Sequence, residues 1–183
     1  MIPFPKKHRA TRKNILPFPN LFLNRWLLAL ALLGFVPPSH ALTLPELLND
    51  AHLTPERLLH RFARFKFKLF DGVQPPVQFL ASETGDCDDF ATLAAYVLRE
   101  KGYHPRLIAV FMPTQVHVVC VVTEAKAYLD YNNRRQDSPL VPTDGSLTDI
   151  AGKVARSFHT TWRCVCEYTV KDGVQHTVST EFR

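Results

Sequence analysis

The chain has 183 residues, 46% of them hydrophobic, which is enough apolar material for one domain with a buried core. Its formal net charge of +5 comes from the first 41 residues, which hold six lysines or arginines and no acidic side chain. Taking those six from the total of 22 leaves 16 basic against 17 acidic side chains. The remainder therefore lacks the excess positive charge of a nucleic-acid-binding domain, and no nucleic-acid partner is expected.

Residues 1–41 have the three parts of a secretory signal. A basic stretch ends at Arg25, an apolar run of eleven residues covers 26–36, and Ser39 and Ala41 are small residues suited to a cut after Ala41. Eleven residues are too few to cross a membrane, which takes about 20. The sequence predicts a signal peptide over 1–41, a mature domain over 42–183, a periplasmic or secreted location, and no membrane span after cleavage. An uncleaved anchor is the alternative, because the basic part is long.

A helix is predicted to begin at Thr54, a capping hydroxyl, with Pro55 in its first turn. Apolar residues then follow at helical spacing, although the end of this segment also alternates like a strand. They are Leu58, Phe62, Phe65 and Leu69. Residues 73–84 contain two adjacent prolines and are interpreted as an irregular connection.

A second helix is predicted from Asp88 to Gly102, because it carries an apolar stripe and ends on a glycine. Three strands rich in branched and aromatic residues follow, over 106–112, 116–122 and 127–131.

The rest of the chain is predicted to contain a loop, a helix and a hairpin. The loop covers 132–145, and the helix begins with Ser146 and Asp149 as a capping pair. Residues 160–170 and 176–182 form the terminal hairpin around the turn at 171–173.

Four cysteines in an exported chain raise the question of disulfides. Cys120, Cys164 and Cys166 lie in strand-like runs, and one of the latter two could reach Cys120 if their strands adjoin. Cys164 and Cys166 share one face of a strand, which suits them poorly to bond each other. If Cys87 acts as the nucleophile, three cysteines remain. Three cannot all pair, so at least one of them is expected to be a buried thiol.

Cys87, His117 and Asp130 occur in the order that a thiol nucleophile, its base and an orienting carboxylate would need. Cys87 lies at the expected start of the second helix, whose dipole favours a thiolate. His117 and Asp130 lie on two successive strands, where the histidine could take the thiol proton and the carboxylate could fix its tautomer. Each residue alone has a simpler structural interpretation, and only their combination favours chemistry.

The length of the turn between the two strands decides whether His117 and Asp130 share a face. A hairpin with a four-residue turn over 123–126 puts Asp130 opposite Val119, and His117 on the same face, about 7–8 Å from Asp130. A turn one residue shorter or longer would put the two on opposite faces.

The segments around these residues resemble the transglutaminase-like superfamily over roughly residues 75–132. They are residues 85–93, 98–106, 117–119 and 128–130. The resemblance implies an α+β, papain-like core in which the nucleophile-bearing helix packs on an antiparallel sheet. It also implies that Cys87 is the nucleophile, His117 the general base and acid, and Asp130 the orienter. The aromatic residue that follows the histidine in many members is absent.

The acids beside Cys87 are similar to those of bacterial transglutaminase-like cysteine proteinases, some of which cut surface adhesins in the periplasm and bind calcium. By that resemblance Asp86 and Asp88 would contribute to a calcium site, although calcium takes 6–8 oxygen ligands. The alternative is that Asp88 and Asp89 only complement the helix dipole. This chain is shorter than many such proteinases.

The sequence thus predicts an exported cysteine hydrolase that cuts amide bonds through a thioester, foremost a peptidase, with no cofactor required for the chemistry. A cross-linking acyltransferase and a non-catalytic binding module of the same fold are the alternatives. The oxyanion donor is expected to include the N–H of Cys87, with Gln74 or Gln78 assisting. Gly85 is expected to allow close substrate approach. The expected partner is a protein or peptide associated with the cell surface or cell wall.

The predicted signal can be tested directly. N-terminal sequencing of the exported protein should begin at Leu42, because the small residues before it suit signal peptidase. A first residue of Met1 would instead support the uncleaved anchor.

Overall fold

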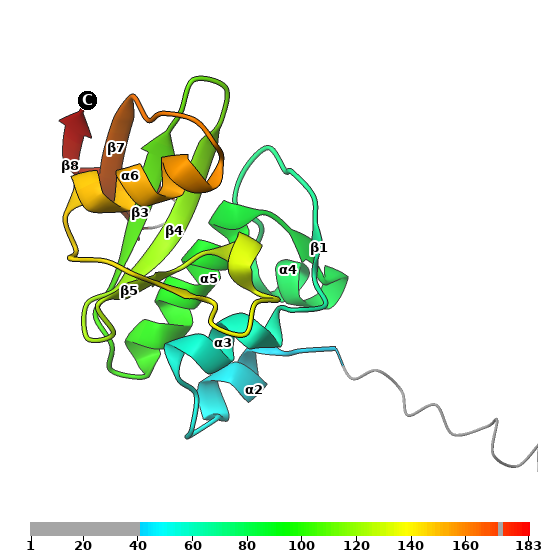
Figure 1. The fold of residues 1–183 in the computed structure, drawn as a ribbon. Helices are drawn as coiled ribbons and strands as arrows, with labels where there is room; N and C mark the ends of the chain where they lie inside the picture. Colours follow the sequence, from blue (N-terminus) through cyan, green and yellow to red (C-terminus); the bar gives the residue numbers. More distant parts are fainter. Residues whose placement is uncertain (1–40, 172–173) are drawn as a thin grey trace, which may run out of the picture. The chain divides into compact units, whose positions relative to one another are not determined.

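The computed structural model describes residues 41–171 and 174–183 (Figure 1). The predicted signal peptide therefore lies almost entirely outside the described residues. The chain divides into two units, Met1–Ser39 and His40–Arg183, and all described elements belong to the second. In chain order they are α2 (Leu44–Asn49), α3 (Pro55–Arg61), β1 (Lys66–Phe67), α4 (Pro76–Ser82), β2 (Thr84–Gly85), α5 (Cys87–Glu100), β3 (Pro105–Phe111), β4 (Val116–Val122), β5 (Ala127–Leu129), the 3-10 helix η1 (Tyr131–Asn133), β6 (Leu140–Pro142), α6 (Leu147–Ser157), β7 (Cys164–Lys171) and β8 (Val174–Phe182).

A six-stranded sheet forms the centre of the fold, in the order β6-β5-β4-β3-β7-β8. Every neighbouring pair of strands is antiparallel. Side chains alternate between its faces, so Leu107 and Ala109 pack with α5, whereas Ile108 and Val110 pack with α6. The cysteine-bearing helix therefore lies on one face of an antiparallel sheet, as the sequence predicted.

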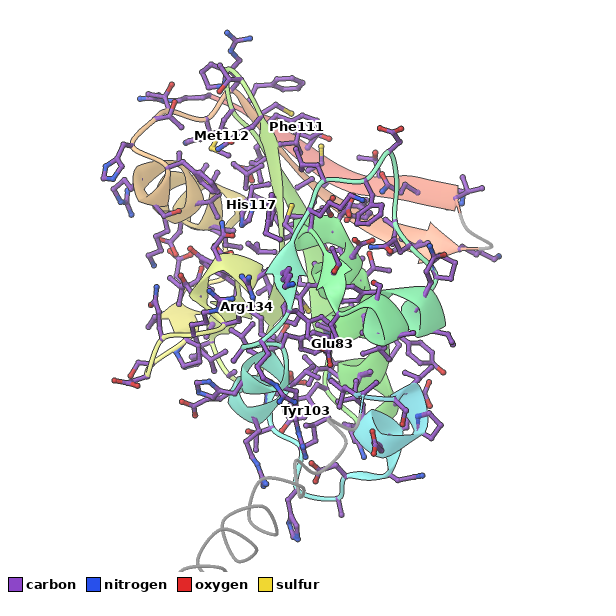
Figure 2. All side chains as sticks on the ribbon, turned by 90° about the vertical axis from the view of Figure 1, so that its right-hand side faces the viewer. Glu83, Tyr103, Phe111, Met112, His117 and Arg134 are labelled. Carbon is purple, nitrogen blue, oxygen red and sulfur yellow. The ribbon has the colours of Figure 1, made fainter. Side chains whose placement is uncertain are left out.

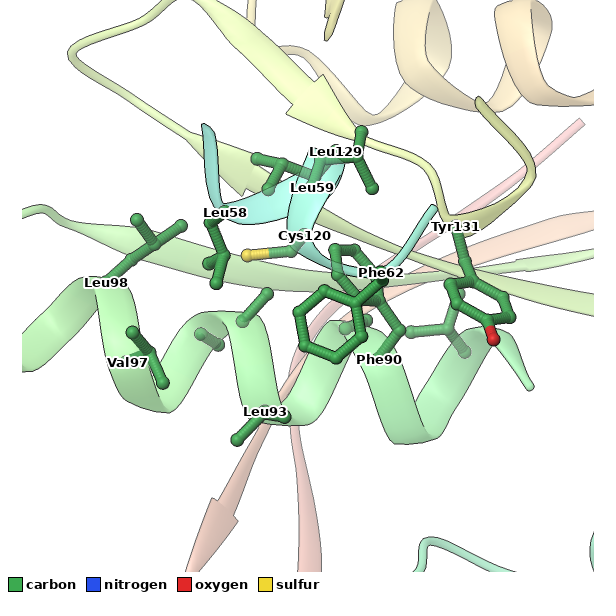
Figure 3. Packing of buried hydrophobic residues seen from close by; sticks show 14 of the residues in the cluster. Leu58, Leu59, Phe62, Phe90, Leu93, Val97, Leu98, Cys120, Leu129 and Tyr131 are labelled. Atoms are coloured by element: carbon green, nitrogen blue, oxygen red, sulfur yellow. The ribbon is translucent and has the colours of Figure 1, made fainter. Parts of the chain in front are cut away.

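Aromatic rings fill the core beside the start of α5 (Figure 3). The ring of Phe62 lies 4.7 Å from Phe65, 5.6 Å from Phe79 and 5.0 Å from Phe90, between centroids. Phe90 in turn stacks on Tyr131 at 5.5 Å. Such pairs add about 0.5–1.5 kcal/mol each beyond the burial of their surface. The cluster thus joins α3, α4 and α5 to the segment that follows β5.

The hairpin of β4 and β5 has the predicted register. Cys120 pairs with Leu129, and Val122 pairs with Ala127. The strand β5 ends at Leu129, so Asp130 leaves the ladder and caps η1 by accepting a hydrogen bond from the N–H of Asn132 at 2.8 Å.

Several predicted boundaries differ from the structure. The helix α3 ends at Arg61, and Leu69, expected on its apolar face, is 73% exposed. The strand alternative for the end of this segment is confirmed by β1 at Lys66–Phe67. The chain turns after Phe62 because Lys66 pairs with Thr84 in the small parallel sheet of β1 and β2. The expected irregular connection contains α4, and the expected loop contains η1 and β6.

The cap of α6 is also only half of the predicted pair. The hydroxyl of Ser146 accepts from the N–H of Asp149, but the carboxylate of Asp149 accepts from Thr143 and Lys153 instead of returning to Ser146. The terminal hairpin forms as predicted from β7 and β8, and its turn at 172–173 lies outside the described residues.

All four cysteines are free thiols. The disulfide considered between Cys120 and Cys164 or Cys166 is wrong, because β3 lies between β4 and β7. Cys120 is fully buried, and this burial raises the pKa of its thiol to about 12, as expected for an inert core residue. Within residues 41–171 and 174–183, no helix has the length and apolar character needed to span a membrane.

Candidate active site

Two aspartates fix the start of α5. The carboxylate of Asp86 accepts from the N–H of Asp88 at 3.3 Å, and that of Asp89 accepts from the N–H of Asp86 at 3.0 Å, which completes a capping box. This pair makes Cys87 the first residue of the helix. The sulfur lies at the edge of the core, with the side chain 9% exposed.

Gln74 secures the same turn and is not free for the role predicted for it. Its backbone N–H donates to Asp89 at 2.6 Å, and its side-chain amide donates to Asp89 at 2.7 Å and to the carbonyl of Thr84 at 3.0 Å. Both amide hydrogens are therefore used, so the prediction that Gln74 assists an oxyanion is wrong. Gln78 is an exposed residue of α4.

Gly85 is required by packing. It is buried, and a Cβ atom at this position would lie 2.5 Å from the ring of Phe79 and 2.6 Å from the carboxylate of Asp89. The structure therefore explains the glycine by the close approach of two buried side chains and not by the approach of a substrate.

His117 and Asp130 form a buried pair. The Nε2 atom of His117 lies 2.9 Å from the carboxylate of Asp130, and both side chains are 4% exposed. Figure 2 shows the position of His117 in the fold. The imidazole contacts the ring of Phe158 at 4.9 Å between centroids. Sequence reasoning missed this contact because Phe158 is distant along the chain and carries no local signal.

The structure brings Cys87 to the same imidazole. Burial alone would lower the pKa of His117, but hydrogen bonds with Asp130 and with Cys87 outweigh it and raise the pKa to about 10. Because Asp130 engages Nε2, Nδ1 is the ring nitrogen left for the thiol. A histidine that keeps its proton at neutral pH beside a sulfur favours a thiolate.

Asp86, Asp88 and Asp89 form the acidic cluster of the site. One oxygen from each lies within 4.8 Å of the others, and Asp88 has a buried Oδ1 atom with no hydrogen-bond partner. Burial and the two neighbouring acids raise the pKa of Asp88 to about 7. An unpaired carboxylate oxygen among three acids suits a hard cation such as calcium, and these residues could supply part of its coordination shell.

Comparison with known proteins assigns the chain to a family. Residues 56–173 match the core of the transglutaminase-like superfamily. The chain belongs to this superfamily. Its membership confirms the resemblance read from the sequence and the predicted papain-like α+β fold.

Solved structures of LapG from Legionella pneumophila are similar in fold. The calcium-bound form has a TM-score of 0.46 and 18% identity, covering 73% of this chain and 75% of that chain. The EGTA-treated form has a TM-score of 0.44 and 16% identity, covering 73% and 77%. A comparison with curated protein sequences found no match.

The contact between Cys87 and His117 predicts that the reactivity of the thiol depends on the histidine. Near pH 6, iodoacetamide should alkylate Cys87 faster in the wild type than in His117→Ala, because the raised pKa of His117 keeps a positive charge beside the sulfur. In His117→Ala the rate near pH 6 should fall at least about tenfold. Mass spectrometry measures the labelling, with Cys87→Ala as the blank for the other thiols. Equal labelling rates of Cys87 in the wild type and in His117→Ala would show that Cys87 and His117 are not coupled.

Proposed function

We propose that this protein is an exported cysteine peptidase that cuts amide bonds through a thioester intermediate. The observation that supports this most is the buried His117, which is hydrogen-bonded through Nε2 to Asp130 at 2.9 Å and lies close enough to Cys87 for the thiol to help raise the pKa of the imidazole. A binding module of the same fold has no need of a protonated imidazole beside a thiol. The three residues come from α5, β4 and the end of β5, so the chain folds three separate segments around one reacting centre.

Each residue has a defined part in the proposed reaction. The thiolate of Cys87 attacks the substrate carbonyl carbon, and the resulting oxyanion is placed near the backbone N–H of Cys87, which as the first residue of α5 has no helical acceptor. His117 then gives its proton to the amine, which leaves as the C–N bond breaks and the thioester forms. Water attacks the thioester, with His117 taking its proton and the thiolate leaving. Asp130 keeps the Nε2–H bound and the ring in place throughout.

The acceptor of the acyl group decides the product. Water gives hydrolysis, whereas an amine would give a cross-linked protein. The proposed substrate is a protein or peptide, because the largely buried Cys87, 9% exposed, is reached most readily by an extended chain. We further propose that the protein acts on surface- or wall-associated proteins outside the cytoplasm, on the basis of the signal-like residues 1–41.

Substitution of the three residues tests the peptidase proposal. Cys87→Ala should abolish cleavage, and His117→Ala should lower kcat/KM by a factor of about 10³ or more, because nucleophile and base act as a unit. Asp130→Asn should cost less, since part of the imidazole still reaches the correct tautomer. Cleavage of a random peptide library followed by mass spectrometry measures all three.

The matched control is Cys164→Ala, which removes a partly exposed thiol of β7 and should leave activity unchanged. Residual cleavage in Cys87→Ala would overturn the assignment of the nucleophile. Adding an amine acceptor to the same assay separates transfer from hydrolysis, because only transfer gives a product with the mass of the added amine.

We also propose that calcium binds the acidic cluster of Asp86, Asp88 and Asp89. The unpaired buried Oδ1 of Asp88 supports this, because ionising the partly buried Asp88 beside two buried carboxylates is costly without a cation. When bound, calcium would supply positive charge beside the nucleophile and fix the first turn of α5. Of the three acids, Asp88 can be substituted with the least effect on folding, because Asp86 and Asp89 also cap α5.

Calcium should therefore raise the melting temperature of the protein, and EGTA should reverse the rise. Calcium at about 100 times its Kd stabilises by about 2.7 kcal/mol, a shift on the order of 5 °C or more for a domain of this size. Asp88→Asn should remove most of the shift, whereas the exposed Asp137→Asn should keep it. An unchanged melting temperature with calcium would leave these acids a role in helix capping alone.

A further inference from the structure

A groove of about 530 Å³ lies beside α5, and its lining includes none of the three residues of the proposed reaction. One wall is a single face of α5, formed by Thr92, Tyr96 and Arg99 at spacings of four and three residues. The opposite wall is β7, with Tyr168 and Val170. The side chains of Tyr96 and Val170 are 41% and 39% exposed, so they offer apolar surface to a ligand.

One end of the groove, at Thr92, lies about one helical turn from the start of α5. Asp88 lies one helical turn before Thr92, on the same face of α5, and directly follows Cys87. Across the groove, burial and the nearby Asp88 and Cys87 raise the pKa of Tyr168. Thr92 and Tyr168 therefore lie beside the reacting centre, and the groove leads away from it along the helix.

Two buried hydroxyl groups at this end have unfilled hydrogen-bonding capacity. The side chain of Tyr168 is 5% exposed, and its hydroxyl lies near that of Thr92. Neither hydroxyl has another hydrogen-bond partner among the described residues. Buried polar groups normally have hydrogen-bond partners. A ligand with carbonyl or amide groups, such as a peptide backbone, would supply partners for these two hydroxyls.

The far end of the groove carries positive charge. Arg106 is neutralised, because it donates to Glu167 at 2.6 Å and to the carbonyl of Gly145 at 2.9 Å. Arg99 is exposed and forms no ion pair within the described part of the chain. The groove therefore offers a guanidinium that can bind a carboxylate of the ligand.

We propose that this groove binds an extended, acidic segment of the substrate polypeptide. Twelve residues of helix separate Cys87 from Arg99, which corresponds to about 18 Å, or five to six residues of extended chain at about 3.3 Å each. An Asp or Glu five to six residues from the cut bond would then meet Arg99, with an apolar residue between Tyr96 and Val170. The inference rests on the proposed peptidase function, and it adds the class of substrate.

A binding experiment tests the groove without catalysis. The Cys87→Ala protein is titrated against a fluorescent ten-residue peptide of alternating Leu and Glu, and against the same peptide with Gln for Glu. The acidic peptide should bind at least tenfold more tightly at low salt, and Arg99→Glu should weaken it roughly tenfold while leaving the Gln peptide unchanged. Arg64→Glu, at an exposed arginine that does not line the groove, is the matched control and should change neither.

The inference would be overturned if the two peptides bound with equal affinity. It would also be overturned if Arg64→Glu lost as much affinity for the acidic peptide as Arg99→Glu. Cleavage of a random peptide library by the wild-type protein then shows where acidic residues lie relative to the cut bond. Asp and Glu should be enriched five to six residues from the cut, and this enrichment should vanish in Arg99→Ala. Cleavage without the enrichment rejects the groove and leaves the peptidase standing. Binding that depends on Arg99, with no cleavage of any peptide, supports the groove and rejects the peptidase.

Discussion

The site depends on the hydrogen bonds that the carboxylate of Asp89 accepts. Asp89 is 2% exposed and accepts hydrogen bonds from the N–H of Asp86 and from both the backbone and the amide of Gln74. Hydrogen bonds to a charged group contribute about 1.5–3 kcal/mol each, and such a carboxylate is costly to bury without them. One side chain thereby ties the segment before α4 to the start of α5. The position of Cys87, the acidic cluster and the near end of the groove all follow from this turn.

The other half of the site comes from the sheet and is joined to the first through aromatic packing. Asp130 directly precedes Tyr131, whose ring stacks on Phe90 three residues after Cys87, at 5.5 Å. Arg134 strengthens the same junction, because it donates to the carbonyls of Tyr131 at 2.7 Å and Phe65 at 2.9 Å. Cys87 and Asp130 are thus held by neighbours in one packed cluster. Precise placement of this kind is what a reaction between three separate segments requires.

Local signals in the sequence predicted the parts of the fold that depend on local chemistry. Thr54 and Ser146 identified two helix starts, and the hairpin spacing gave the register that brings His117 to Asp130. The failures concern tertiary contacts. The apolar spacing through Leu69 continued a helix that the sheet pairing of Lys66 interrupts, and α4 and β6 are too short to show a period. Gln74 was assigned to catalysis because its partner, Asp89, lies 15 residues away, and only the fold shows that its amide is used.

The electrostatics around Cys87 are balanced between two opposite influences. His117, with a pKa of about 10, contributes a positive charge that favours the thiolate, whereas an ionised Asp88 one residue away disfavours it. With a pKa of about 7, Asp88 is about half ionised at neutral pH, so its charge increases as pH rises through that value, while His117 stays protonated until about pH 10. A cation on the acidic cluster would neutralise Asp88 and leave the influence of His117 unopposed. On the proposed function, this gives calcium an electrostatic role at the nucleophile even though it would take no part in bond making.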